Sequence, residues 1–243
     1  TSDGFQVDAD VKVNTNAEKY VSWNWKESAT AGFDIVTFTG NETGRTIAHS
    51  LSAVPEFMII KNRTWADGAH TYHVTNGGTD SIEIATNNAT GASSTIWNNT
   101  DPTSSVFTVG TNGNINRTDY AIFVYLFTSK QGFSKIGTYE GNGNADGTFV
   151  YTGFRPAWVL TKSADSTSSW EIFDNKREGY NVDNDALVVD DPIVEATADQ
   201  IDLLSNGFKL RIATDPNVAE TYIYMAFAEA PFVNSNGVPC NAR

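Results

Sequence analysis

One long stretch of this chain occurs twice, and the duplication limits what the chain can fold into. The later copy, residues 132–162, reads GFSKIGTYEGNGNADGTFVYTGFRPAWVLTK, and the earlier copy, residues 32–61, reads GFDIVTFTGNETGRTIAHSLSAVPEFMIIK. Each copy has an alternating run, a turn rich in Gly and Asn, a second run, and a strand opened by Pro55 or Pro156, which is typical of three successive β-strands. A repeat of this length describes a whole domain rather than a solenoid unit.

A shorter pattern marks the end of each unit and occurs three times. It begins near Phe5, Phe107 and Phe208 and closes in the runs 20–26, 122–127 and 222–227. The end of the unit therefore occurs three times and its beginning twice, so we expect the chain to start inside the tail of a preceding unit. The resulting division is a hairpin stub at 1–27, a first unit at 28–130, a second unit at 131–230 and a C-terminal tail at 231–243.

The residue types indicate an all-β protein. Runs of Thr, Val, Ile, Phe, Tyr and Trp alternate with clusters of Gly, Asn, Asp and Ser, and helix signals are nearly absent. Strands of the first unit are expected near 33–39, 45–50, 56–62, 69–75, 81–85, 106–110 and 120–128. This number of short strands per unit is typical of a β-sandwich or jelly roll. The predicted fold is two tandem antiparallel β-sandwich domains preceded by an N-terminal β-hairpin.

Two segments are expected to differ from ordinary sandwich strands. The run 122–127 is apolar on both faces, which predicts a strand inside a sheet rather than at its edge. The tail has two prolines and no pairing pattern, so we expect it to pack through Phe232 and Val233 and then run over the surface.

The composition excludes several classes of partner. The chain has 16 Lys and Arg against 29 Asp and Glu, a net charge of −13. This argues against nucleic acid, since phosphate binding needs a basic face, and against an anionic membrane surface. No apolar run approaches the roughly 18 residues of a membrane span, so no membrane insertion is expected. The single cysteine, Cys240, cannot form an internal disulfide and is expected to be a free thiol. With no initiator Met or signal peptide visible, we expect a C-terminal piece of a longer protein.

The duplication provides an internal control for candidate binding residues. Aromatic positions matched in both copies are expected in the core, namely Phe57/Trp158, Tyr72/Phe173, Phe107/Phe208 and Phe127/Phe227. Trp65, Trp97 and Tyr180 lie in loops and have no such match, so they are candidates for stacking on sugar rings. The alternative for each is that its ring seals the end of its own sandwich, which is the commoner role of an aromatic residue.

The densest group of oxygen ligands is Asp183-Asn184-Asp185, followed by Asp190-Asp191. Calcium takes six to eight hard oxygens, but this group lacks the glycine and the closing glutamate of an EF-hand loop. A solvated acidic loop is therefore preferred, and no metal and no cofactor is predicted. Asp183 and Asp185 remain candidates for binding the hydroxyl groups of a ligand.

No catalytic motif is present. His70 and His73 are three residues apart, which on a strand places them on opposite faces and is poor geometry for one metal ion. There is no Gly-x-Ser-x-Gly, P-loop, HExxH or Cys-His arrangement. Carboxylate pairs occur by chance among 29 acidic residues, so a glycosidase stays open, although no pair stands out. We expect no enzyme and assign no catalytic residue.

Several phrases together resemble a known family. These are PEFMIIKNR, SSTIWNNTDPTSSVFTVG, IDLLSNGFKLR, TYIYMAFAEAPF and the final GVPCNAR. They resemble the C-terminal repeat region of large structural proteins of tailed bacteriophages, especially marine ones, which often follows a concanavalin A-like lectin module. The resemblance covers essentially the whole chain. It departs at Ala69, where the family usually has Trp three residues before a Tyr-His pair, here Tyr72-His73.

The resemblance implies a virion protein at the particle surface. The expected role is a distal tail-fibre or spike module that attaches to a host-surface polysaccharide, as a homotrimer among other virion proteins. One alternative is a purely structural head-fibre, decoration or spacer protein, which a large apolar interface without an open groove would favour. A second is a carbohydrate-binding module of a secreted adhesin or of a depolymerase.

Overall fold

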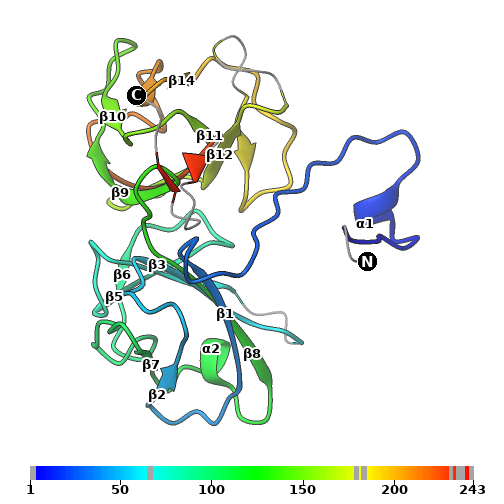
Figure 1. Ribbon diagram of the computed structural model, residues 1–243, viewed down its shortest axis with the longest axis vertical. Helices are drawn as coiled ribbons and strands as arrows, with labels where there is room; N and C mark the ends of the chain where they lie inside the picture. Colours follow the sequence, from blue (N-terminus) through cyan, green and yellow to red (C-terminus); the bar gives the residue numbers. More distant parts are fainter. Residues whose placement is uncertain are drawn as a thin grey trace.

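The computed structural model describes residues 4–64, 68–177, 181 and 185–229, and the backbone of 232–233 and 239–240. Figure 1 shows two β-rich lobes, with the first unit below and the second above, and an N-terminal segment that runs in from the side to their junction. Within the described residues, no helix has the length and apolar character needed to cross a membrane.

The first unit contains a six-stranded sheet and a two-stranded sheet, all antiparallel. The strand order is β1-β8-β3-β4-β5-β6 in the larger sheet and β2-β7 in the smaller one. A single-turn helix, α2 (Gly113–Asn116), precedes β8. The strands are β1 (Phe33–Thr39), β2 (Arg45–Ala48), β3 (Phe57–Asn62), β4 (His70–His73), β5 (Asp80–Glu83), β6 (Gly91–Ala92), β7 (Val106–Val109) and β8 (Ala121–Phe127).

The second unit repeats this plan with a five-stranded and a three-stranded sheet. Their orders are β13-β12-β11-β16-β9 and β10-β15-β14. The strands are β9 (Ser134–Glu140), β10 (Phe149–Tyr151), β11 (Pro156–Ser163), β12 (Glu171–Asp174), β13 (Leu187–Val188), β14 (Ile201–Leu204), β15 (Gly207–Leu210) and β16 (Thr221–Ala228).

The two main sheets have corresponding strands in the same order. The run β1-β8-β3-β4 in the first unit matches β9-β16-β11-β12 in the second. Both prolines that open the third strand of the repeat, Pro55 and Pro156, are buried. The predicted all-β class with antiparallel sandwiches is confirmed, and β1 covers the predicted residues.

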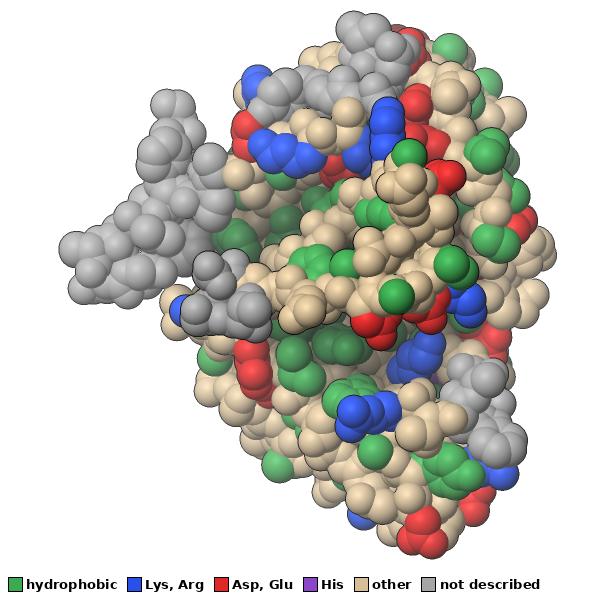
Figure 2. All heavy atoms as spheres, turned by 90° about the vertical axis from the view of Figure 1, so that its right-hand side faces the viewer, with side chains coloured by type: hydrophobic (Ala, Val, Ile, Leu, Met, Phe, Trp, Pro, Cys, Tyr) green, Lys and Arg blue, Asp and Glu red, His purple; other side chains and the backbone are tan. Residues whose placement is uncertain are grey.

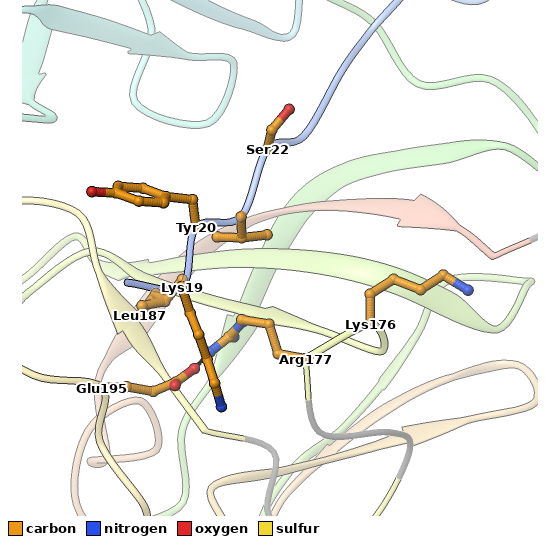
Figure 3. Close-up of a pocket in the computed structure, with 8 residues that line it drawn as sticks. Lys19, Tyr20, Ser22, Lys176, Arg177, Leu187 and Glu195 are labelled. Atoms are coloured by element: carbon orange, nitrogen blue, oxygen red, sulfur yellow. Dashed lines mark ion pairs between the residues drawn. The ribbon is translucent and has the colours of Figure 1, made fainter. Parts of the chain in front are cut away.

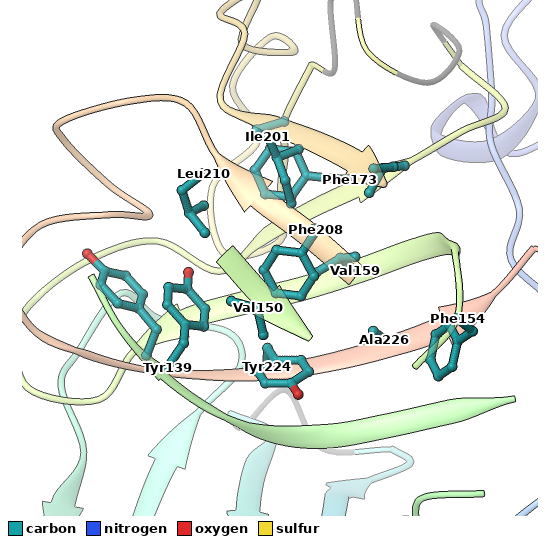
Figure 4. Packing of buried hydrophobic residues seen from close by; sticks show 13 residues of the cluster. Tyr139, Val150, Phe154, Val159, Phe173, Ile201, Phe208, Leu210, Tyr224 and Ala226 are labelled. Atoms are coloured by element: carbon teal, nitrogen blue, oxygen red, sulfur yellow. The ribbon is translucent and has the colours of Figure 1, made fainter. Parts of the chain in front are cut away.

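The main sheets pack on both faces, and this explains their apolar strands. In β8, Ile122, Val124 and Leu126 are fully buried in the core of the first unit, which lies between the six-stranded sheet and β7. Phe127 points to the other face and is also buried, and β8 lies between β1 and β3, as its pattern predicts. The second unit has an equivalent inner core, built around Val159, Phe208 and Tyr224 (Figure 4). All eight matched aromatic residues predicted to be core are buried.

The turn after the first strand is so close-packed that only glycine fits at one position. A Cβ added at Gly40 would lie 2.1 Å from the carbonyl oxygen of Arg117, and one at Gly141 would lie 1.9 Å from that of Val218. Neither contact is possible for a real side chain, so the repeated Gly-Asn of the sequence follows from a close approach of two backbone segments.

A buried asparagine holds this turn in each unit. Asn116 accepts a hydrogen bond from the Asn41 amide at 3.1 Å and donates to the carbonyls of Thr43 and Gly110 at 2.9 and 2.7 Å. Asn217 accepts from the Asn142 amide at 3.1 Å and donates to the carbonyls of Asn144 and Ile212 at 2.8 and 2.7 Å. Both side chains are fully buried, so each replaces water as the partner of otherwise unpaired backbone groups.

The predicted hairpin in the stub is wrong for the described residues. Residues 4–27 contain one single-turn helix, α1 (Val11–Asn14), and no strand. An isolated two-stranded hairpin is marginal in water, and no sheet of the described residues includes a strand from residues 4–27. Only the end of the segment, at Trp23 and Trp25, finds an apolar surface to pack on.

The expectation of an unpaired tail is wrong at four residues. Two short strands, β17 (Phe232–Val233) and β18 (Pro239–Cys240), pair antiparallel. The intervening sequence is rich in Asn, Ser and Gly, which favour turns. The side chains of Phe232, Val233 and Cys240 lie outside the described part, so their predicted packing and the predicted free thiol stay predictions.

Candidate functional site: the seam between the units and the N-terminal segment

The main sheets of the two units face each other across one apolar cluster, here called the seam. Because each sheet already covers its own inner core on its opposite face, the seam joins the two units through buried side chains. Its buried members are Phe33, Phe57, Ile82 and Phe127 of the first unit and Ile136, Trp158, Leu160, Trp170, Ile172, Ile223, Met225 and Phe227 of the second.

Hydrogen bonds between loops fix the seam at one end. The Trp170 indole donates to the Glu83 carbonyl at 2.9 Å, so a buried ring of the second unit is held by a strand of the first. The Thr90 amide donates to the Ala164 carbonyl at 3.0 Å, and the Ser168 amide donates to the Asn87 carbonyl at 2.9 Å. These bonds set the orientation that the non-directional apolar contacts leave open.

The N-terminal segment inserts two tryptophans into the seam. The Trp25 ring lies 6.3 Å from Phe127 and 5.4 Å from Phe227, and these two rings lie 6.1 Å apart, centroid to centroid. Trp25 holds the place in the first copy of the end pattern that Phe127 and Phe227 hold in the later copies. Corresponding residues of three copies therefore meet at one point. Trp23 and Trp25 also contact Trp158, at 6.4 and 5.4 Å.

A cavity of about 570 Å³ lies between this segment and the second unit. Its lining residues are Lys19, Tyr20, Val21 and Ser22 from the segment and Lys176, Arg177, Leu187 and Glu195 from the second unit (Figure 3). The volume is in the range of small-molecule sites. On this side of the molecule, Lys and Arg side chains gather above a hollow with a hydrophobic floor (Figure 2).

The side chain of Arg177, which lines this cavity, is held in place by ion pairs and hydrogen bonds. Its guanidinium forms ion pairs with Asp174 at 2.7 Å and with Glu195, and it donates to the carbonyls of Ile172 and Asp185 at 3.2 and 2.7 Å. These bonds tie the end of β12 to the segment before β14. The arginine thus has a structural role here, and Lys19 and Lys176 are the exposed cations of the lining.

A family model matches residues 1–231, from the N-terminal segment through the last strand of the second unit. Its description is "Domain of unknown function (DUF7483)". The chain belongs to this family. The matched range includes the seam and all three copies of the end pattern, so the arrangement described here lies within the family's extent. No curated protein and no solved structure matches the chain.

Of the predicted binding residues, the structure describes Trp97 and Asp185, which lie in different units. Trp97 is fully buried in the inner core of the first unit, with its ring 5.9 Å from Tyr72, so its prediction as an exposed sugar-stacking residue is wrong and the sealing alternative holds. Trp65, Tyr180 and Asp183 lie outside the described residues. Asp185 is buried, and its carbonyl accepts the bond from Arg177 beside the cavity. Among the described residues, no group of three His, Cys, Asp or Glu could hold a metal ion.

A second pocket, of about 200 Å³, is lined by His70, Ser81 and Glu83 among others. His70 Nδ1 lies 3.0 Å from Ser81 Oγ, and its Nε2 lies 3.3 Å from Glu83 Oε1. Burial lowers the pKa of His70, and the Glu83 carboxylate opposes this. His70 and Glu83 are also directly paired across β4 and β5, so an ordinary cross-strand contact accounts for the arrangement.

The corresponding position of the second unit carries a partly buried acid, Glu171. Burial raises its pKa to about 8, and the charges of Asp215 and Asp190 add to this. Nearby, Tyr222 donates to Asp215 at 2.6 Å and stacks on Tyr139 at 5.1 Å. Neither of the two cavities described above is lined by Glu171, and its Oε2 atom is buried, so we assign this group to the interior of the sandwich.

The sequence reasoning missed two exposed aromatic residues on β10, Phe149 and Tyr151. The signal was available in the repeat. In the first unit β2 has Thr46 and Ala48 at the corresponding places, so the aromatic residues occur in one copy alone. Their position on a strand, and not in a loop, is typical of core residues and conceals their exposure.

Proposed function

We propose that the chain is a module of a tailed-bacteriophage virion, in the distal part of a tail fibre or spike, where it joins successive β-sandwich units and takes part in attachment to the host surface. The phage assignment is supported by the resemblance of its repeat phrases to phage structural proteins. The joining role is supported by the seam.

The single observation that carries the joining role is the meeting of Trp25, Phe127 and Phe227. Units linked only by a flexible connection would move independently. Here the end of one copy of the pattern packs on the ends of two others, so consecutive units share buried aromatic surface. Such a series resists bending, which suits a fibre that must hold a binding surface away from the particle.

The rest of the N-terminal segment has the character of an assembly surface. Phe5 is 63% exposed, whereas its counterparts Phe107 and Phe208 are fully buried. Val7 is likewise exposed, and its counterparts Val109 and Leu210 are buried. Exposed apolar residues grouped on one segment are typical of a surface covered by another chain or domain. We therefore assign the cavity beside Tyr20 to this junction rather than to a ligand.

Labelling of intact particles tests the proposal. Antibodies raised against residues 28–229 are applied to purified virions and viewed by electron microscopy. We expect label at the distal end of a tail fibre or spike and a trimer in solution by sedimentation. Label on the capsid would instead support a head-fibre or decoration protein. Absence of label from the particles, with the protein found in the medium of uninfected cells, would contradict the virion assignment and favour a secreted adhesin or depolymerase module.

Limited trypsin digestion tests the docking of the N-terminal segment. We expect cleavage after Lys12 and Lys19 but slow cleavage after Lys26, because Lys26 follows the docked Trp25. Trp25→Ala should expose the Lys26 site, while the matched control Phe5→Ala, at an exposed ring of the same segment, should not. Equal cleavage at all three lysines in the unaltered chain would contradict docking.

A further inference from the structure

We propose that the outer face of the three-stranded sheet β10-β15-β14 is a binding site for a neutral polysaccharide, with Phe149 and Tyr151 as its stacking platform. Both residues lie on β10 with Val150 between them pointing into the core, so their rings share the outer face. Phe149 is 44% exposed and Tyr151 is 65% exposed.

The repeat shows that these rings are not needed by the fold. Val150 pairs with Phe208, and Ile47 pairs with Phe107, so the two strands correspond residue by residue. The first unit forms the same strand with Thr46 and Ala48 on its outer face, both exposed. Two large apolar side chains placed in water in one copy alone are a feature that the sandwich architecture leaves unexplained.

Each of the two rings lies next to a glycine. A Cβ added at Gly207 would lie 2.0 Å from the Val150 carbonyl oxygen and 3.1 Å from Phe149 Cε2, so the Phe149 ring lies beside a position of β15 where no side chain fits. A Cβ added at Gly153 would lie 3.6 Å from the Tyr151 hydroxyl oxygen. The negative face of an aromatic ring attracts the C–H groups of a sugar ring, so two exposed rings on one face of a sheet suit stacking on a sugar.

Polar groups beside the rings could bind the hydroxyl groups of the sugar. Lys209 is paired with Phe149 across the strands, forms an ion pair with Asp146 at 2.9 Å and donates to the Gly147 carbonyl at 2.7 Å. On the next strand Asp202 forms an ion pair with Arg211. A few placed polar groups around an apolar platform are what a sugar site requires.

The size and charge of the face select the ligand. Two aromatic side chains bury at most about 500 Å² together, below the roughly 800 Å² per partner of a stable protein interface. A second protein chain is therefore a poor fit.

The charges on the face are paired with one another, and the chain carries a net charge of −13, so an acidic polymer would be repelled. A neutral polysaccharide fits both conditions. That it comes from a host surface rests on the proposed attachment role, whereas the stacking site rests on the geometry.

Native gel electrophoresis through dissolved polysaccharide tests the site. Gels contain a soluble glucan, galactan, mannan or xylan, or alginate as an acidic polymer. We expect retardation of the whole chain by at least one neutral polymer, and at least a tenfold weaker apparent affinity for the double variant Phe149→Thr with Tyr151→Ala, which restores the residue types of the first unit. The control Phe5→Thr with Tyr20→Ala removes two other exposed rings and should bind as the unaltered chain does.

Retardation by none of the neutral polymers, by alginate alone, or equally for the double variant would overturn the proposal. An equal loss in the control would also overturn it, because binding would then depend on the N-terminal segment. Thermal melting of each variant shows that the fold is retained. The gel retardation does not depend on the particle labelling. The two experiments therefore distinguish a fibre module without a sugar site from a sugar-binding protein outside a virion.

Discussion

The two units have the same four strands in the same order, but the residue two positions before the matched pair Tyr72/Phe173 is His70 in one and Glu171 in the other. His70 lines a small pocket and touches Ser81 and Glu83, whereas Glu171 is partly buried beside a stacked tyrosine pair. The units agree where backbone geometry demands it, at Gly40/Gly141 and Asn116/Asn217. Differences between them therefore mark places that the shared fold leaves free to change.

The largest loss of unfolding free energy is expected for a substitution in the seam, where the two units contact each other. Trp158→Ala removes a ring that contacts Trp23, Trp25 and Phe227 in the seam. Loss of a buried aromatic side chain costs about 3–5 kcal/mol, and because the seam belongs to both units we expect both to unfold at lower urea. Hydrogen exchange during unfolding reports each unit separately. If strands of the second unit alone lose protection, the seam does not couple the units.

The next largest effect tests whether equivalent residues of the two units contribute equally to the free energy of unfolding. Asn116→Ala and Asn217→Ala each remove the hydrogen bonds of a fully buried side chain to three backbone groups, so each should lose about 3 kcal/mol of unfolding free energy. Urea unfolding measures both, with the exposed Asn88→Ala as the control near zero. A clear loss in one variant and none in the other would break the equivalence of the two turns.

A smaller, pH-dependent effect sharpens the contrast between His70 and Glu171. The folded pKa of Glu171, about 8, lies above its ordinary value of 4.5, so the folded state keeps a proton that the unfolded chain releases. Its contribution is present in full below pH 4.5 and is lost as the pH rises to 8. Glu171→Gln should therefore have little effect at pH 4.5 and raise the unfolding free energy by roughly 4 kcal/mol at pH 8.

For His70→Gln, we expect the stability gain to change with pH in the opposite direction, growing as the pH falls. Burial lowers the pKa of His70, so its contribution is present above pH 6.5 and is lost as the pH falls. The variant should gain stability relative to the unaltered chain only on the acid side. Urea unfolding at pH 5, 6.5 and 8 measures both variants. A Glu171→Gln variant with a constant difference across this range would show that Glu171 is ionised in the folded protein.

The smallest effect is expected on the outer face of β10. Phe149→Thr and Tyr151→Ala should each change the unfolding free energy by no more than about 0.5 kcal/mol, as for surface residues in general. Thermal melting measures the change. A loss of 2 kcal/mol or more would mean that the rings stabilise the sheet, and the difference from Thr46 and Ala48 would then be structural.

The strands could be predicted well from the sequence because the same strand pattern occurs in both copies of the repeat. An alternating run with a glycine turn predicted β1 at its observed bounds, and the matched aromatic residues predicted the inner cores. Local patterns failed where a segment depends on distant partners. The stub has strand-like residues, but without neighbouring strands residues 4–27 form none.

The site could be predicted only in part, because it arises from contacts between units. Trp97 is unmatched in the repeat, yet its side chain turns inward and packs on Tyr72, and sequence does not state that direction. The seam requires knowing that the outer faces of two sheets meet, which depends on packing across distant positions. Phe149 and Tyr151 were detectable from the copy comparison, since a strand position that changes from Thr or Ala to an exposed ring is visible in the alignment of the two units.

Differential scanning calorimetry of the whole chain tests most directly whether the seam makes one cooperative body of the two units. We predict a single transition in which the calorimetric and van't Hoff enthalpies agree, since both units lose the shared aromatic cluster together. Two resolved transitions, or a calorimetric enthalpy about twice the van't Hoff value, would show that the units unfold independently and would contradict this account.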